Sequence, residues 1–174
     1  TSGNAVNCPV DFILENSVEY ADYKISGIEG YTPANLATLW YTQPATTTGV
    51  SNTWMEYSLP IGNGQFGASL FGGVEKDEIQ FNEKTLWSGG PNEYGYYLNF
   101  GSVYVEEISG ELGYGSDKLV KDYYRQLDLS TATGTVSFKN VDKSVTYTRE
   151  YIASNPDKCV AVRYGASKSG KISL

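Results

Sequence analysis

The segment at residues 54–91 constrains the fold of this chain more than any other, because its apolar residues alternate at strand spacing. Phe66, Ala68 and Leu70 lie on one face of an extended backbone. After a polar break at residues 75–77, Ile79 and Phe81 resume the same alternation. The segment therefore predicts a β-hairpin.

Polar residues frame this hairpin. Asn63-Gly64 is a strong turn dipeptide, since both residues tolerate the positive φ of a tight primed turn, and a reversal there would make the hairpin the middle of a meander. At its far end the alternation puts Glu83 on the apolar face, whereas Gln80 and Asn82 face the other way. A carboxylate on an apolar face must be paired or hydrogen-bonded to keep its charge.

The rest of the chain continues in strands. No stretch shows a sustained 3.6-residue apolar period, and short alternating runs separated by turn residues are typical of a sandwich. We therefore expect an all-β chain folded as an antiparallel β-sandwich with little or no helix. Later strands are expected at residues 103–108, 119–129, 133–139, 144–153 and 158–164, with a hairpin loop at 140–143.

Charge and composition exclude several functions. The chain has 20 acidic and 13 basic residues and a net charge of −7, which disfavours a nucleic acid or an anionic membrane as a partner and suits a neutral substrate. It has no histidine, so a Ser-His-Asp nucleophile and the usual zinc sites cannot be built. We expect neither a metal nor a cofactor.

Two cysteines leave an alternative open. Cys8 and Cys159 lie far apart in the sequence, so a disulfide between them would close a long loop. In the chain-entropy model such a disulfide would increase the free energy of unfolding by about 4 to 5 kcal/mol. The same spacing fits two ordinary buried thiols.

A series of motifs then resembles the opening of the N-terminal domain of glycoside hydrolase family 95, the α-L-fucosidases. The motifs follow one another in the family's order, and weaker similarity continues to the end of the chain, so the resemblance covers about residues 39–174. The main motifs are Leu39-Trp40-Tyr41, Pro44-Ala45, Leu59-Pro60-Ile61-Gly62-Asn63-Gly64, Gly67-Ala68, Phe71-Gly72-Gly73-Val74 and Asn82-Glu83-Lys84-Thr85-Leu86-Trp87.

The resemblance carries expectations about the whole protein. It implies a β-sandwich at residues 39–174 that stops short of the family's full domain. Residues 1–38 lie outside the resemblance, and we expect them to form an extension packed on the sandwich. In the family, hydrolysis inverts the anomeric centre and the acid and base sit in a downstream (α/α)6 barrel, so no catalytic residue is assigned here. A secreted, cell-surface or periplasmic protein of bacterial type is expected, acting on fucosylated glycans.

The acidic residues of the motif do not form a catalytic pair. Glu78 and Glu83 are five residues apart on one expected strand, so their side chains leave opposite faces and cannot flank one glycosidic bond. Asn82 and Glu83 are instead candidates for the interface with the barrel. Two further neighbouring pairs, Arg125 with Asp128 and Arg149 with Glu150, suggest ion pairs or hydrogen bonds along strands.

The aromatic residues allow two interpretations. The chain has 15 tyrosines and 3 tryptophans, and aromatic rings stack on the C–H faces of sugars. A glycan platform would make the chain a carbohydrate-binding module in its own right. The simpler interpretation, which we favour, puts the tryptophans in the core and leaves the tyrosines half-buried. The residues concerned are Trp54, Trp87, Tyr94, Tyr96 and Tyr97.

Overall fold

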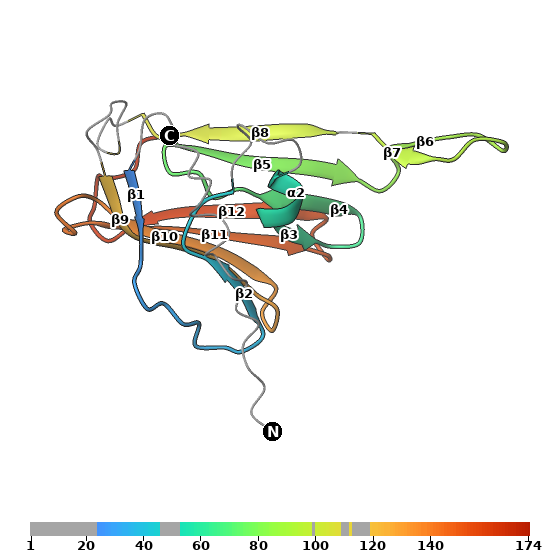
Figure 1. Ribbon diagram of the computed structural model, residues 1–174. Helices are drawn as coiled ribbons and strands as arrows, with labels where there is room; N and C mark the ends of the chain where they lie inside the picture. The colour runs from blue at the N-terminus through green and yellow to red at the C-terminus, as the bar shows by residue number, and fades with distance from the viewer. Residues whose placement is uncertain (1–23, 46–52, 99, 109–111, 113–118) are drawn as a thin grey trace, which may run out of the picture.

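A computed structural model describes residues 24–45, 53–98, 100–108, 112 and 119–174, which form two β-sheets packed face to face (Figure 1). The larger sheet has the order β1-β9-β10-β11-β12, and β2 also pairs with β9. β1 runs parallel to β9, whereas the other pairs are antiparallel. Its strands are β1 (Lys24–Gly27), β2 (Thr38–Tyr41), β9 (Leu119–Asp128), β10 (Thr133–Lys139), β11 (Thr146–Ser154) and β12 (Cys159–Ala166).

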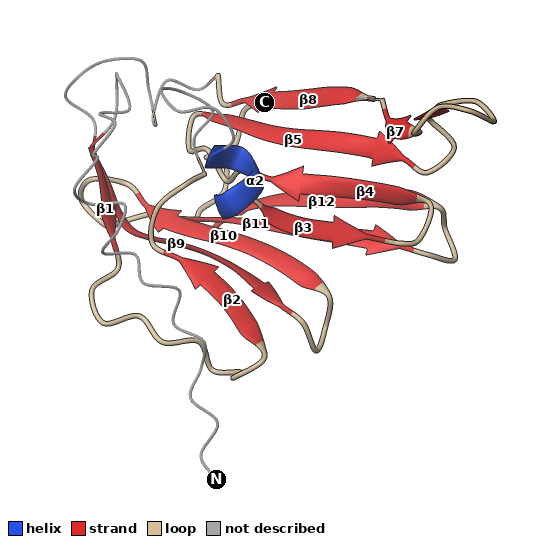
Figure 2. Cartoon of the chain, turned by 45° about the vertical axis from the view of Figure 1, so that its right-hand side comes forward, coloured by secondary structure: helices blue, strands red, loops and turns tan. Residues whose placement is uncertain are grey.

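The smaller sheet is antiparallel, in the order β3-β4-β5-β8 (Figure 2). Little helix accompanies the two sheets in the described ranges, so the predicted all-β sandwich is confirmed. The remaining elements are β3 (Leu59–Gly62), β4 (Phe66–Leu70), β5 (Lys76–Glu83), β8 (Gly101–Glu106), the hairpin strands β6 (Trp87–Ser88) and β7 (Tyr96–Tyr97), and the helix α2 (Thr53–Tyr57).

The predicted meander β3-β4-β5 is present, but its first turn differs in detail. The loop at residues 63–65 has three residues, and among them only Gly64 has a positive φ, of 85°. Asn63 keeps an ordinary φ and folds its side chain back instead. Its Oδ1 accepts hydrogen bonds from the backbone N–H groups of Gln65 at 2.9 Å and Phe66 at 2.7 Å. This side-chain closure replaces the primed turn.

The later strands agree with the sequence analysis to within two residues at each end. The predicted loop at residues 140–143 connects β10 to β11, and Asn140 Oδ1 closes it by accepting from the N–H of Val145 at 2.9 Å. The helix α2 was not anticipated. It contains Trp54, the first residue of the segment from which the hairpin was predicted.

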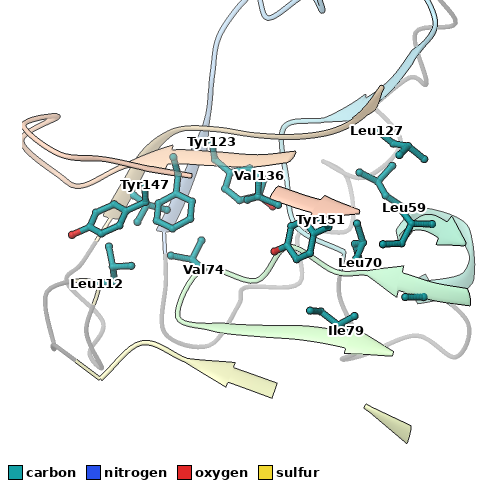
Figure 3. Packing of buried hydrophobic residues seen from close by; sticks show 14 of the residues in the cluster. Leu59, Leu70, Val74, Ile79, Leu112, Tyr123, Leu127, Val136, Tyr147 and Tyr151 are labelled. Atoms are coloured by element: carbon teal, nitrogen blue, oxygen red, sulfur yellow. The ribbon is translucent and has the colours of Figure 1, made fainter. Parts of the chain in front are cut away.

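The core lies between the two sheets and follows the alternation of the strands (Figure 3). Leu70 and Ile79 of the smaller sheet and Val136 and Tyr151 of the larger sheet are almost fully buried. Burying one such side chain stabilises the fold by about 1.5 to 3 kcal/mol relative to leaving it exposed.

The described part of the N-terminal extension and the strand β2 that follows it pack along one edge of the larger sheet. β1 and β2 lie end to end against β9, and Tyr31 between them stacks on Tyr124 with ring centroids 4.4 Å apart. The Tyr31 hydroxyl donates to the Gln126 side chain. Burial, with a smaller contribution from Tyr124, raises the pKa of Tyr31 to about 12.

Two predicted pairs along strands are wrong, because both arginines point into the sandwich. Arg125 is buried, donates to the Gln43 carbonyl at 2.7 Å and lies over the Tyr41 ring at 4.2 Å. Asp128, three residues further on and therefore on the other face, accepts instead from Asn35 at 2.9 Å.

Arg149 likewise crosses the sandwich rather than pairing with Glu150. It approaches Asp77 of β5 at 3.7 Å and donates to the carbonyls of Gly73 and Val74, all of which belong to the opposite layer or its loop. Glu150 points the other way and pairs with Arg163 on the surface.

Asp77 is the centre of this buried polar cluster. Its side chain is fully buried, and two hydroxyls from the larger sheet donate to Oδ2, that of Tyr151 and that of Tyr164 at 3.0 Å. Burial alone would lower the pKa of Arg149, but the Asp77 carboxylate raises it, so the arginine is held charged. The facing charges of Asp77 and Arg149 and the hydrogen bonds from the two tyrosines thus join β5 to β11 and β12.

Substituting Asp77→Asn tests this connection. The change leaves the Arg149 charge buried without its counter-ion, so we expect the free energy of unfolding to fall by about 3 to 5 kcal/mol. Urea unfolding measures it. The control is Glu150→Gln, which removes a surface pair next to Arg149 in the same strand and should cost less than about 1 kcal/mol. Equal losses in the two variants would contradict the assigned role of Asp77.

The same cluster predicts sensitivity to alkaline pH. Burial and the neighbouring Asp77 raise the pKa values of Tyr151 and Tyr164 above the usual tyrosine value. The folded chain therefore holds these protons when the unfolded chain releases them, so the stability they provide is present below about pH 10 and is lost as the pH rises above it. We expect Tyr164→Phe to lose less stability than the parent chain between pH 9 and pH 11 in urea titrations. Tyr94→Phe, at a fully exposed position, should behave like the parent.

Candidate functional site

Four exposed aromatic residues lie on the β6–β7 hairpin, which extends beyond the end of β5 in Figures 1 and 2, and Phe100 and Tyr104 are exposed outside it. Trp87 is 53% exposed, Tyr96 61% and Tyr97 55%, and Tyr94 in the connecting loop is fully exposed. Tyr96 and Tyr97 are, as expected, strand residues that are only partly exposed, whereas Tyr94 lies in a loop. Our interpretation of Trp87 as a core residue and of Tyr94 as a half-buried strand residue is therefore wrong. The reason is that the chain leaves the sandwich after Glu83, so alternation no longer reports burial.

The hairpin is held together by its own residues. Trp87 pairs with Tyr97 across the two strands, and their rings meet edge to face with centroids 4.7 Å apart. The indole also packs directly on Gly95, where any side chain would overlap it. Close packing of this kind fixes the orientation of both rings.

The other predicted site residues are not brought to this hairpin. Trp54 belongs to α2, a separate element. Cys8 lies outside the described residues, whereas Cys159 begins β12 at an exposed position. Cys159 is thus not the buried thiol that one alternative expected, whereas the alternative of a disulfide with Cys8 stays open.

A cleft of about 470 Å³ lies on the outer face of the smaller sheet, beside this hairpin. We call it the outer-sheet cleft. Strands β3, β4 and β5 supply its floor and Tyr97 and Leu98 supply a wall. Its lining residues are Pro60, Ile61, Gly67, Ala68, Ser69, Gln80, Phe81, Asn82, Tyr97 and Leu98.

Strand register brings the floor residues together. Ser69 lies opposite Gln80, and Gly67 lies opposite Asn82, so the four positions form two adjacent rows on one face. The sequence alone placed Gln80 and Asn82 on the outer face, but it missed Ser69 and Gly67 as their neighbours. Only the β4–β5 register, which the alternation leaves undetermined among shifts of two residues, shows that they meet.

Asn82 and Glu83 face in opposite directions at the end of β5. Asn82 lines the outer-sheet cleft, and its Oδ1 accepts from the N–H of Glu83 at 2.8 Å. Glu83 accepts hydrogen bonds from the side chain and the backbone N–H of Thr85, which lower the pKa of this carboxyl. Glu83 thus closes the turn that leads to β6. The role of both residues at a module interface stays a prediction.

Glu78 is engaged on the other side of the sheet from Glu83. It accepts from the hydroxyls of Ser102 at 2.9 Å and Tyr104 at 3.2 Å on the neighbouring strand β8. Both carboxylates of β5 that the sequence analysis considered are therefore occupied by contacts within the chain.

No group of three or more potential metal-ligating side chains of His, Cys, Asp or Glu occurs in the ranges that the structure describes. In the same described ranges, no helix is long and apolar enough to cross a membrane.

Fold and site together define a β-sandwich module that presents exposed aromatic residues beside a cleft, and the comparisons place it within the glycoside hydrolases. The sequence matches the glycosyl hydrolase family 65, N-terminal domain, over residues 39–97 and 92–174. The chain belongs to this family of N-terminal domains.

Two curated relatives agree with this assignment. The chain is 31% identical to "Alpha-L-fucosidase 2" of Arabidopsis thaliana, in a match that covers 72% of this chain and 18% of the relative. It is 25% identical to "Probable alpha-fucosidase A" of Aspergillus niger, over 75% of this chain and 20% of the relative. The chain thus spans about a fifth of the length of these relatives.

The exposure of Trp87 leads to a prediction about stability. A buried tryptophan would cost about 3 to 5 kcal/mol on truncation to alanine. Because Trp87 is half exposed and its main partner is Tyr97, we expect Trp87→Ala to cost no more than about 1.5 kcal/mol in urea unfolding. Ile79→Ala, in the core of the same sheet, should cost about 2 to 5 kcal/mol. A larger loss for Trp87→Ala than for Ile79→Ala would refute this assignment.

Proposed function

We propose that this chain is the non-catalytic N-terminal module of a secreted family 95 α-L-fucosidase-like glycoside hydrolase that acts on fucosylated glycans. Its role is structural or adjacent to the substrate, beside an (α/α)6-barrel catalytic module. The observation that carries the proposal is the match to a family of glycoside hydrolase N-terminal domains, together with two relatives named as α-fucosidases. The ordered motifs of residues 39–87 support the choice of family 95.

The arrangement of carboxylates supports a non-catalytic role. Two-carboxylate hydrolysis uses an acid and a second carboxylate about 5 to 10 Å apart on either side of the glycosidic bond. Glu78 and Glu83 leave opposite faces of β5, and each already accepts hydrogen bonds from a neighbouring residue. Neither is poised to face the other across a substrate.

A second function, recognition of a glycan by this chain itself, is favoured by the exposed aromatic residues of the β6–β7 hairpin. Exposed aromatic rings that lie against each other, as Trp87 and Tyr97 do, are typical of a binding surface. Affinity electrophoresis against xyloglucan, pectin, mucin and glucans distinguishes the two roles. A purely structural module is expected to migrate unretarded in every gel.

The proposed division of labour predicts that the purified chain releases no fucose from 2′-fucosyllactose or from fucosylated xyloglucan. The measurement is fucose released above a buffer control, with a purified α-L-fucosidase as the positive control. Release that disappears in Glu83→Gln or Glu78→Gln would show that the chain carries catalytic carboxylates, and would overturn the proposal.

A further inference from the structure

We propose that the outer-sheet cleft is a binding site for a neutral oligosaccharide, in which Tyr97 stacks on a sugar ring and the polar floor binds its hydroxyls. This inference rests on the proposed carbohydrate-related function and adds to it a location, a set of contacts and a class of ligand. It differs from an aromatic platform at the tip of the hairpin, because only Tyr97 of the exposed aromatic residues lines the cleft.

The floor of the cleft contains hydrogen-bond donors and acceptors that are available to a ligand. In the described part of the chain, the side chains of Ser69 and Gln80 have no hydrogen-bond partner, and Asn82 uses only its Oδ1, on the N–H of Glu83. An amide side chain has donors and acceptors in one plane, and a hydroxyl is both donor and acceptor. Sugar hydroxyls have the same dual character, so the floor matches them in kind.

Strand geometry spaces these groups for an extended ligand. The row formed by Ser69 and Gln80 and the row formed by Gly67 and Asn82 are two residues apart, which is about 7 Å along the strands. A ligand that contacts both rows must therefore be long enough to span this distance. An open volume of about 470 Å³ is within the range of small-molecule sites.

The wall of the cleft is rigid and apolar. Tyr97 is held edge to face by Trp87, and the backbone N–H of Leu98 donates to the Leu86 carbonyl at 3.0 Å. A ring already fixed by its neighbours loses little conformational entropy when it stacks on a ligand. Pro60 adds a further apolar surface on the opposite side of Ser69, with which it is in register.

The uncharged lining of the cleft favours a neutral ligand. None of the ten residues that line the cleft is charged. The carboxylate that shares the outer face, Glu78, is engaged with Ser102 and Tyr104. Without a basic residue, a uronic acid or a phosphorylated sugar would be desolvated without a counter-ion, which is costly. A neutral oligosaccharide avoids that cost.

Gly67 provides a variant that closes the cleft without disturbing the sheet. A Cβ at this position would meet nothing nearer than the Ile61 carbonyl oxygen at 4.0 Å, so the strand has room for a side chain that projects into the cleft. Valine also suits a strand. Gly67→Val should therefore fold with an unchanged urea midpoint, or a slightly higher one, and fill the space between Ser69 and Asn82.

The experiment titrates the ¹⁵N-labelled chain with a neutral xyloglucan heptasaccharide, with 2′-fucosyllactose and with a trigalacturonate. We expect at least one neutral probe to shift the backbone signal of Gly67 and the side-chain amide signals of Gln80 and Asn82. Gly67→Val should weaken that binding by about tenfold or more, and Gln80→Ala, which loses a hydrogen bond, by about two- to tenfold. Trigalacturonate should bind far more weakly.

A matched control separates the cleft from the hairpin tip. Gly90→Val makes the same substitution at an open position on the β6–β7 connection, outside the cleft, and should leave the affinity within about twofold. If a neutral probe binds but its shifts are confined to Tyr94 and Tyr96 and Gly67→Val has no effect, glycan recognition stands and the cleft assignment fails. If no neutral probe binds, or trigalacturonate binds equally well, the cleft is not a neutral-sugar site, whereas the fucose-release assay is unaffected.

Discussion

The sandwich depends on the buried contact between Asp77 and the three side chains that reach it from the opposite sheet. The two layers share an apolar core that could slide, since dispersion and the hydrophobic effect have little direction. The hydrogen bonds from Tyr151 and Tyr164 are directional, and both end on the one carboxylate that faces the charge of Arg149. They set the position of β5 relative to β11 and β12, and therefore the position of every residue on the outer face of β5.

The functional surface follows from that placement. Once β5 is fixed, its outward residues Gln80 and Asn82 and its turn residue Glu83 have fixed positions, and the hydrogen bonds from Thr85 to Glu83 direct the chain into the β6–β7 hairpin. Core and cleft are thus opposite faces of a single strand. Ala68 is buried and also borders the cleft, so a substitution at this position would affect both the core and the cleft.

Much of the fold could be predicted from the sequence because a sandwich strand carries its own signal. Alternation marked β4, β5 and the strands after residue 100, and it correctly placed Glu78 and Glu83 on opposite faces. The partners of Arg125 and Arg149 could not be predicted, because alternation reports the face of a strand and not what lies across the core. The prediction that Trp87 is buried failed for another reason. The sequence does not distinguish an aromatic residue that a strand buries from one that a hairpin exposes to solvent. The cleft needed the register of β4 on β5, which a repeat of two residues does not determine.

The way in which β1 and β2 pair with β9 has a consequence for how this chain is made. Both strands are synthesised before their partner along the sheet edge, which comes about ninety residues later. Until β9 has left the ribosome, β1 and β2 lack the neighbour that completes their ladders, and an unpaired strand is a template for association with other chains. Contacts this distant in sequence also slow folding, since loop closure must precede the gain in stability. The chain therefore passes through a vulnerable interval during translation, and its duration is determined by the length of the segment between β2 and β9.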